Sequence, residues 1–146
     1  MGRVINPESA GKERTRLTRS IVLAIRSLTQ QTEPNQLTRD LSAYIVLALT
    51  AIAESIESSV VPWEKRGYWV KADRFRLEWD WTARYAAEMQ AALFNEDWAQ
   101  VAMTAAHIAQ KLNNVKVPQR HRLGEPWVGA WKQLQANQKN GSASLS

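Results

Sequence analysis

The sequence predicts an all-α protein: an up-and-down four-helix bundle with a Trp-bearing C-terminal arm and a short extra helix. The first observation is a stripe of side chains between Tyr68 and Leu93, spaced alternately four and three residues apart over about seven helical turns. The second is that no run of alternating β-branched residues is long enough for a sheet. The third is that the 5 Pro and 6 Gly fall mostly at the expected junctions between helices. Helices packed on helices are therefore expected.

Length and composition predict a single domain at residues 1–136, followed by a disordered tail at residues 137–146. A chain of 146 residues with 45% hydrophobic content can bury one core and is short for two. Cysteine is absent, which excludes disulfides, thiolate metal sites and cysteine catalysis. No apolar segment of signal-peptide length opens the chain, and the longest uncharged run, residues 41–53, is shorter than the roughly 20 residues of a membrane span. We expect a cytoplasmic protein with no membrane partner.

The first two helices are defined by their apolar faces and by the breaks that follow them. The first is expected from about residue 9 or 11 to residue 31, and Pro34 lies in the break after it. The second is expected from about residue 37 to residue 60. Pro62 either ends this helix or kinks it, in which case residues 63–66 form a last turn and Gly67 a left-handed cap. The inward positions are Leu17, Ile21, Ala24 and Leu28 in the first helix, and Leu41, Tyr44, Ile45, Ala48, Ile52 and Ile56 in the second.

The third helix is the striped segment, residues 68–94, and the fourth follows at once. Asn95 is expected to cap the fourth helix, with Glu96 and Asp97 in its first turn, where the helix dipole favours acidic side chains. The stripe of the third helix is Tyr68, Ala72, Phe75, Trp79, Thr82, Ala86, Met89 and Leu93. The expected inner positions of the fourth are Trp98, Ala102, Ala105, Ile108, Ala109 and Leu112.

The C-terminal arm is expected to begin after residue 114. Residues 117–122 should form an extended basic connector. Pro126 is suited to the first turn of a short helix that carries Trp127, Trp131 and Leu134.

Positive charge is concentrated at the two ends of the chain and at its middle turn. Residues 1–32 carry six Lys or Arg against two Glu, and residues 101–146 carry six against Glu125 alone. On a helical wheel, four cations of the first helix lie opposite its apolar stripe, and an arm folded beside this helix would join the two basic blocks. Such a patch attracts phosphate backbones or acidic proteins, although charges on an outer helix face can also be merely solvated. The candidate nucleic-acid-binding residues are Lys12, Arg16, Arg19, Arg26, Lys116, Arg120 and Arg122.

Tryptophan is unusually frequent, with seven residues, four of them within residues 63–81. Trp79 and Trp98 occupy inner helix positions, where a large ring fills the core. Trp63, Trp69 and Trp81 fit the stripe less well, and they are the candidate aromatic contact residues. Each of these three could cover the bundle end, pack beneath the arm or face a second subunit. Trp69 and Trp79 also alternate with basic residues, an arrangement that could stack bases while the guanidinium groups hold phosphates.

Enzyme motifs are incomplete. All-helical pyrophosphohydrolases need two pairs of carboxylates for magnesium. Glu54 and Glu57 form one such pair, but three residues after Glu78 comes Trp81, so the second pair is missing. The Glu-x-x-His motif of di-iron bundles is absent as well. The sequence predicts no catalytic residue, no metal ligand set and no cofactor.

Two segments carry a resemblance. Residues 63–76, read with residues 14–19, resemble small all-helical bacterial proteins, which implies a helical fold and no particular chemistry. At the level of fold alone, the chain is similar to small basic four-helix bundles that act as RNA-binding accessories, such as the diversity-generating retroelement accessory protein and the ribosomal-RNA intervening-sequence proteins.

Three functional hypotheses follow. The first is a non-enzymatic basic module that binds a negatively charged partner, RNA or DNA, as an oligomer. The second is a protein-interaction or scaffold subunit that uses exposed tryptophans. The remote third is a carboxylate-metal enzyme at Glu54 and Glu57.

Overall fold

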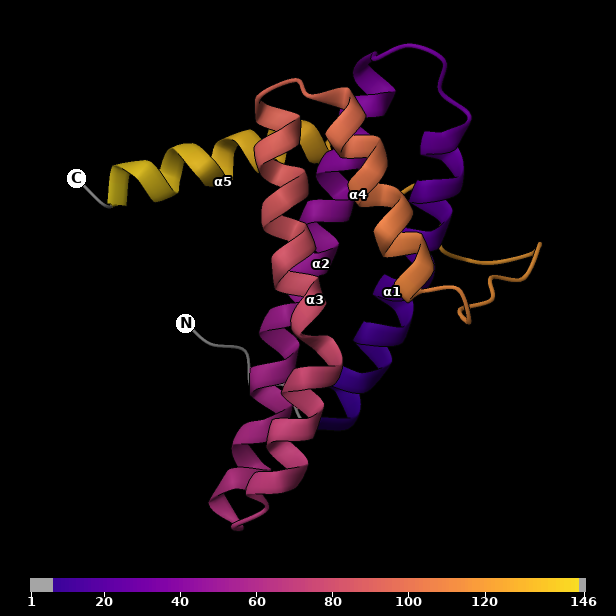
Figure 1. The fold of residues 1–146 in the computed structure, drawn as a ribbon. Coiled ribbons are helices and arrows are strands. Elements are labelled where there is room, and N and C mark those ends of the chain that lie inside the picture. The colour runs from indigo at the N-terminus through magenta and orange to yellow at the C-terminus, as the bar shows by residue number, and fades with distance from the viewer. Residues whose placement is uncertain (1–6, 145–146) are drawn as a thin grey trace.

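The computed structural model describes the backbone of residues 7–144 and the side chains of residues 9–140, and every regular element in that part of the chain is a helix (Figure 1). The helices are α1 (Pro7–Thr29), α2 (Gln36–Lys65), α3 (Trp69–Phe94), α4 (Trp98–Lys111) and α5 (Ala130–Ser144). The all-α prediction is confirmed. α2 packs against α1, α3 and α5, while α4 packs against α3 and touches α1.

The core is built around α2. All six positions of this helix that were predicted to point inward are buried, and Leu41, Ile45 and Ile52 are completely enclosed. By length and composition α2 could span a membrane, but half of its most apolar window is buried inside the protein. Its apolar character is therefore accounted for by its central place among the other helices.

Pro62 lies inside α2 and does not end it. The helix continues to Lys65, and the Gly67 backbone N–H donates to the Glu64 carbonyl at 3.0 Å. Gly67 adopts φ +82°, a left-handed conformation that glycine reaches without steric cost and that belongs to the alternative in which the helix continues past Pro62. The chain then turns directly into α3.

The stripe predicted for α3 is largely buried. Ala72, Thr82, Ala86, Met89 and Leu93 are buried, and Phe75 and Trp79 are half-buried. Tyr68 is different, because it precedes the helix and is exposed.

The junction between α3 and α4 differs from the prediction. Asn95 ends α3, Glu96 has φ +54°, and the Asp97 carboxylate caps α4 by accepting the Gln100 N–H at 3.2 Å. The buried face is also rotated from the predicted one, since Ala102 and Ala109 are exposed. The buried residues of α4 are Val101, Thr104, Ala105 and Ile108, followed by Leu112 at its C-cap. Alanine occurs on both faces of this helix, so it marked the inner face poorly.

The arm returns to α2 and is fixed there by Asp40. This buried carboxylate accepts the backbone N–H groups of Gly129 at 3.3 Å and Trp131 at 3.0 Å, at the start of α5. Trp127 is buried in a turn just before α5, whereas a helix beginning near Pro126 was expected.

α5 is longer than the predicted short helix. It runs to Ser144, through most of the segment expected to be disordered, while residues 145 and 146 lie outside the described part. Once the first turn is fixed by packing, a segment without proline can extend the helix at little cost per residue.

Arg14 connects α1 to both helices of the α2–α3 pair. Its guanidinium donates to the hydroxyl groups of Ser55 and Ser59, at 3.2 and 3.0 Å, and lies 5.0 Å from the centre of the Phe75 ring. Partial burial lowers the pKa of Arg14, and the charge of Glu78 opposes that change. These contacts anchor α1 close to the part of α2 and α3 that projects beyond it.

Candidate nucleic-acid interface

The most distinctive surface is the end of the α2–α3 pair, residues 63–74, which we call the hairpin tip. In Figure 1 this end extends beyond α1 and α4. Tyr68, Trp69 and Val70 are 54%, 59% and 65% exposed there. Three consecutive large apolar residues at a projecting turn have no core to join, and such exposed groups often mark a binding surface.

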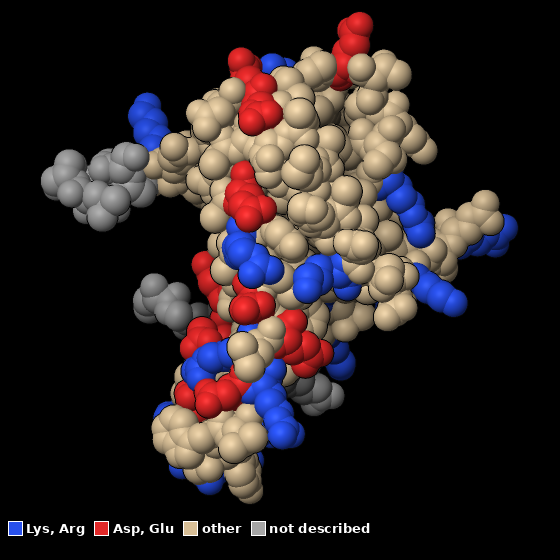
Figure 2. Space-filling model, in the orientation of Figure 1, with Lys and Arg blue, Asp and Glu red and all other residues tan. Residues whose placement is uncertain are grey.

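Four cations surround these apolar side chains: Lys65, Arg66, Lys71 and Arg74, all exposed. None of them forms an ion pair with a carboxylate in the described part of the chain. Figure 2 shows the uncharged surface of this end with blue Lys and Arg side chains around it and red Asp and Glu side chains on the side toward the rest of the molecule. The charge of the four cations is therefore available to an external anion.

Three of the nearby acids, Glu57, Glu64 and Asp73, lie against Arg76, whereas Glu78 does not pair with it. The Arg76 guanidinium contacts both oxygens of Glu57, at 2.8 and 3.0 Å, and both oxygens of Glu64, at the same two distances. These hydrogen bonds lower the pKa of Glu57 and of Glu64 and raise the pKa of Arg76. Asp73 also lies 3.7 Å from this guanidinium.

The contact with Arg76 affects the ability of Glu54 and Glu57 to bind a metal ion together. Both oxygens of Glu57 are occupied by a cation, whereas Glu54 lines a separate hollow with Ser9, Ala10 and Glu13. The residues described include no cluster of three or more groups able to hold a metal.

The three candidate aromatic residues have different environments. Trp81 is 6% exposed and stacks on Trp79 at 6.2 Å, so the prediction that it makes an external contact is wrong. Trp81 lies two residues after Trp79, roughly 200° further around the helix, so its burial comes from tertiary packing on a second side of α3. Trp63 is half-buried, with Phe75 against its ring and the Lys71 ammonium 4.2 Å from the ring centre.

Trp69 alone of the three keeps its ring open. Among the residues that the structure describes, no aromatic ring or cation stacks on Trp69 or on its neighbour Tyr68. Residues 67–71 line a shallow hollow around it, and a second hollow, lined in part by Trp63, Arg74 and Glu78, shares Val70 and Lys71 with the first. The two hollows therefore adjoin each other at Val70 and Lys71.

The basic residues predicted to bind nucleic acid lie on a different part of the molecule. All seven are exposed, four on α1 and three on the connector between α4 and α5. Arg16 pairs with Glu13 and shares a hollow with Pro126 and Val128, so the arm passes beside α1 at that point. Figure 2 shows Lys and Arg along the edge where the connector projects.

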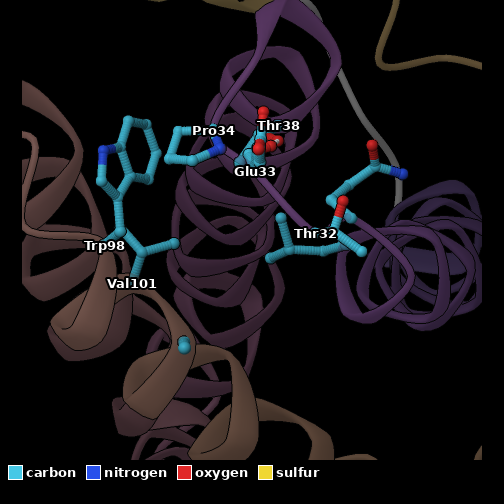
Figure 3. Close-up of a pocket in the computed structure, with 9 residues that line it drawn as sticks. Thr32, Glu33, Pro34, Thr38, Trp98 and Val101 are labelled. Atoms are coloured by element: carbon cyan, nitrogen blue, oxygen red, sulfur yellow. Dashed lines mark hydrogen bonds between the residues drawn. The ribbon is translucent and has the colours of Figure 1, made fainter.

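A further pocket lies between the α1–α2 turn and α4 (Figure 3). It measures about 180 Å³, and Trp98, Val101 and Pro34 contribute to its lining. The Thr38 hydroxyl in its wall already donates to the Glu33 carbonyl at 3.2 Å. The pocket presents no acid–base pair, so we assign no chemistry to it.

Sequence reasoning placed Tyr68 in the stripe and did not select Val70, Lys65 or Arg66 as site residues. The sequence did contain a signal for an exposed apolar site. Three large apolar residues directly follow Gly67, the glycine that ends a helix, so they lie in the turn and the start of the next helix and not along one buried helix face. That the turn projects beyond α1 could be recognised only from the structure.

Comparison with known proteins gives no match to any protein family, curated protein or solved structure.

Proposed function

We propose that the protein is a non-enzymatic helical module that binds nucleic acid, and that α1 to α4 form an up-and-down four-helix bundle with α5 as its arm. The observation that carries the functional proposal is the hairpin tip, where four cations border an exposed aromatic and apolar surface and pair with no carboxylate of the described residues. Phosphate groups complement the cations, and bases complement the rings.

We propose that the basic residues of α1 and the connector attract the nucleic acid from a distance and do not hold it at fixed contacts. Exposed cations of one sign raise the local concentration of a polyanion and its association rate, without each making a fixed contact. Charge reversal of Arg19 and Arg120 together should therefore slow association and leave dissociation nearly unchanged.

The main test is affinity for RNA and DNA oligonucleotides, measured by fluorescence anisotropy between about 50 and 200 mM salt. Binding through phosphates should weaken linearly on a log–log plot, by about 0.7 to 0.9 per neutralised phosphate. The double variant Lys65→Glu with Arg66→Glu should lose roughly tenfold or more in affinity.

The matched control is Lys132→Glu with Lys139→Glu, which changes the net charge equally but lies on α5. It should retain most of the affinity. Equal losses in the two double variants would mean that binding reflects net charge alone, and no binding at low salt would refute the function.

The second candidate function is that of a protein-interaction subunit. It is supported by Leu77, which is 71% exposed and follows the hairpin tip by about one turn of α3. An oligomer or partner contact at this surface would cover Leu77 together with Val70. Light scattering that gives a monomer for the wild type and for Leu77→Asp would exclude self-association through this surface.

A further inference from the structure

We propose that the hairpin tip recognises unpaired bases: the Trp69 indole is a stacking platform, while Lys71 and Arg74 hold the adjoining phosphates of a single strand of RNA or DNA. This inference rests on the proposed function and specifies its ligand. It makes Trp69, rather than the tryptophans in general, the residue that distinguishes one nucleic-acid form from another.

The Trp69 ring differs from the other two tryptophan rings near the tip because it is available for stacking. Trp63 already has Phe75 at 5.2 Å and Lys71 at 4.2 Å, and Trp81 is buried against Trp79. Trp69 is 59% exposed and, in the part of the chain that the structure describes, has no stacked partner. Its ring can therefore receive a flat ligand with little rearrangement of the protein.

The position of the cations also supports this ligand. Lys71 lines the hollow around Trp69 and also the adjoining hollow, where Arg74 lies one helical turn further along α3. The Lys71 ammonium lies 4.2 Å from the centre of the Trp63 ring, and this ring lines the second hollow. A base on Trp69 would thus have its backbone directed toward two cations.

The form of the nucleic acid follows from the ring. In a duplex the faces of the bases are covered by their neighbours, and a projecting indole meets only backbone and groove edges. In a single strand each base exposes a face that an aromatic side chain can cover, with little dependence on sequence. A platform beside phosphate-binding cations therefore suits a single strand better than a duplex.

The experiment compares a labelled single strand of mixed sequence with its duplex, using the full chain and its variants. We expect wild type to prefer the single strand by about tenfold, Trp69→Ala to lose at least about fivefold on the single strand only, and Trp69→Phe to stay within about threefold of wild type. Trp69→Leu should resemble Trp69→Ala, because leucine keeps apolar bulk but has no ring.

The control variant is Met103→Ala on α4, since Met103 is 54% exposed and lies outside the tip. It should bind as wild type does. Circular dichroism establishes that each variant is folded. Lys71→Gln with Arg74→Gln should also reduce the salt slope on the single strand by about 1.4, at roughly 0.7 per phosphate contact.

The outcomes separate this inference from the function on which it rests. Equal, salt-sensitive binding of both forms that Trp69→Ala leaves unchanged would overturn the stacking inference and leave the proposed function standing. Binding to phosphatidylserine vesicles but to neither nucleic acid would overturn both. Retention of single-strand affinity by Trp69→Leu would also refute stacking, since it would show that apolar bulk is sufficient.

Discussion

Asp40 shows how much a single buried residue can determine in this protein. Its two carboxylate oxygens accept separate backbone N–H groups, from Gly129 and Trp131, and so cap the start of α5. In the sequence Asp40 is an ordinary acid near the beginning of a helix. Its partners are 89 and 91 residues away, so no local pattern reveals the contact.

Asp40→Asn should destabilise the fold by about 1 to 3 kcal/mol, because asparagine has one acceptor oxygen and would leave an amide N–H without its partner. Urea unfolding followed by circular dichroism measures the change. Asp80→Asn, at an exposed position on α3, is the control and should have almost no effect. Equal stability of Asp40→Asn and wild type would show that the cap contributes nothing.

Trp79 carries a buried Nε1 donor with no hydrogen-bond acceptor in the described part of the chain. Removing an unsatisfied donor offsets part of the lost packing. Trp79→Phe should therefore cost less than about 1 kcal/mol, whereas Trp81→Phe, at a position 6% exposed, should cost about 1 to 3 kcal/mol. Chemical unfolding of both variants checks the order, and the reverse order would contradict it.

At the scale of elements, the sequence predicts the buried face of a helix best where side-chain size differs strongly between the two faces. α2 presents Leu and Ile inward, and all of its predicted inner positions are buried. α4 offers alanine on both faces, so its buried face was assigned incorrectly at Ala102 and Ala109. The Asn95 cap failed for a related reason: Asn95, Glu96 and Asp97 are adjacent polar residues, and packing of α4 decides which of them caps it.

The Arg76 clamp between α2 and α3 predicts a pH dependence of stability. Pairing with Arg76 lowers the folded-state pKa of Glu57 and of Glu64. The stability that these ion pairs contribute is therefore fully present above the ordinary glutamate pKa, about 4.3, and is lost as the pH falls below that value through the lowered pKa. The melting temperature of wild type should therefore fall more between about pH 5 and pH 3 than that of Arg76→Gln. Arg74→Gln, two residues earlier on α3, should keep the wild-type profile.

At the scale of the whole molecule, the sequence revealed the charge blocks and the aromatic-basic middle turn but not their arrangement in space. The cations of α1 and the connector were selected because they are numerous. The tip was recognised only when α2 and α3 were seen to extend beyond α1 (Figure 1). Trp63, Trp69 and Trp81 show the same limit, since one is covered, one open and one buried, and that difference depends on tertiary packing.

Limited trypsin digestion tests this arrangement. The connector carries exposed Lys116, Arg120 and Arg122 outside any helix, so cleavage should occur there first. The released ends should remain associated during gel filtration, because Trp127 and Leu134 are buried in the body. In Asp40→Asn the C-terminal fragment should dissociate more readily. First cleavage within α2 or α3 would contradict the described packing.

The link between Asp40 and the start of α5 also has a consequence for how the chain is made. α1 to α4 are synthesised before residue 129, so the apolar surface that Trp127 and Leu134 cover stays open until the C-terminal arm has been made. Closure of that end is then a late, long-range step. A nascent chain arrested before residue 127 exposes this surface to chaperones, which gives the final fifth of the protein a part in its quality control.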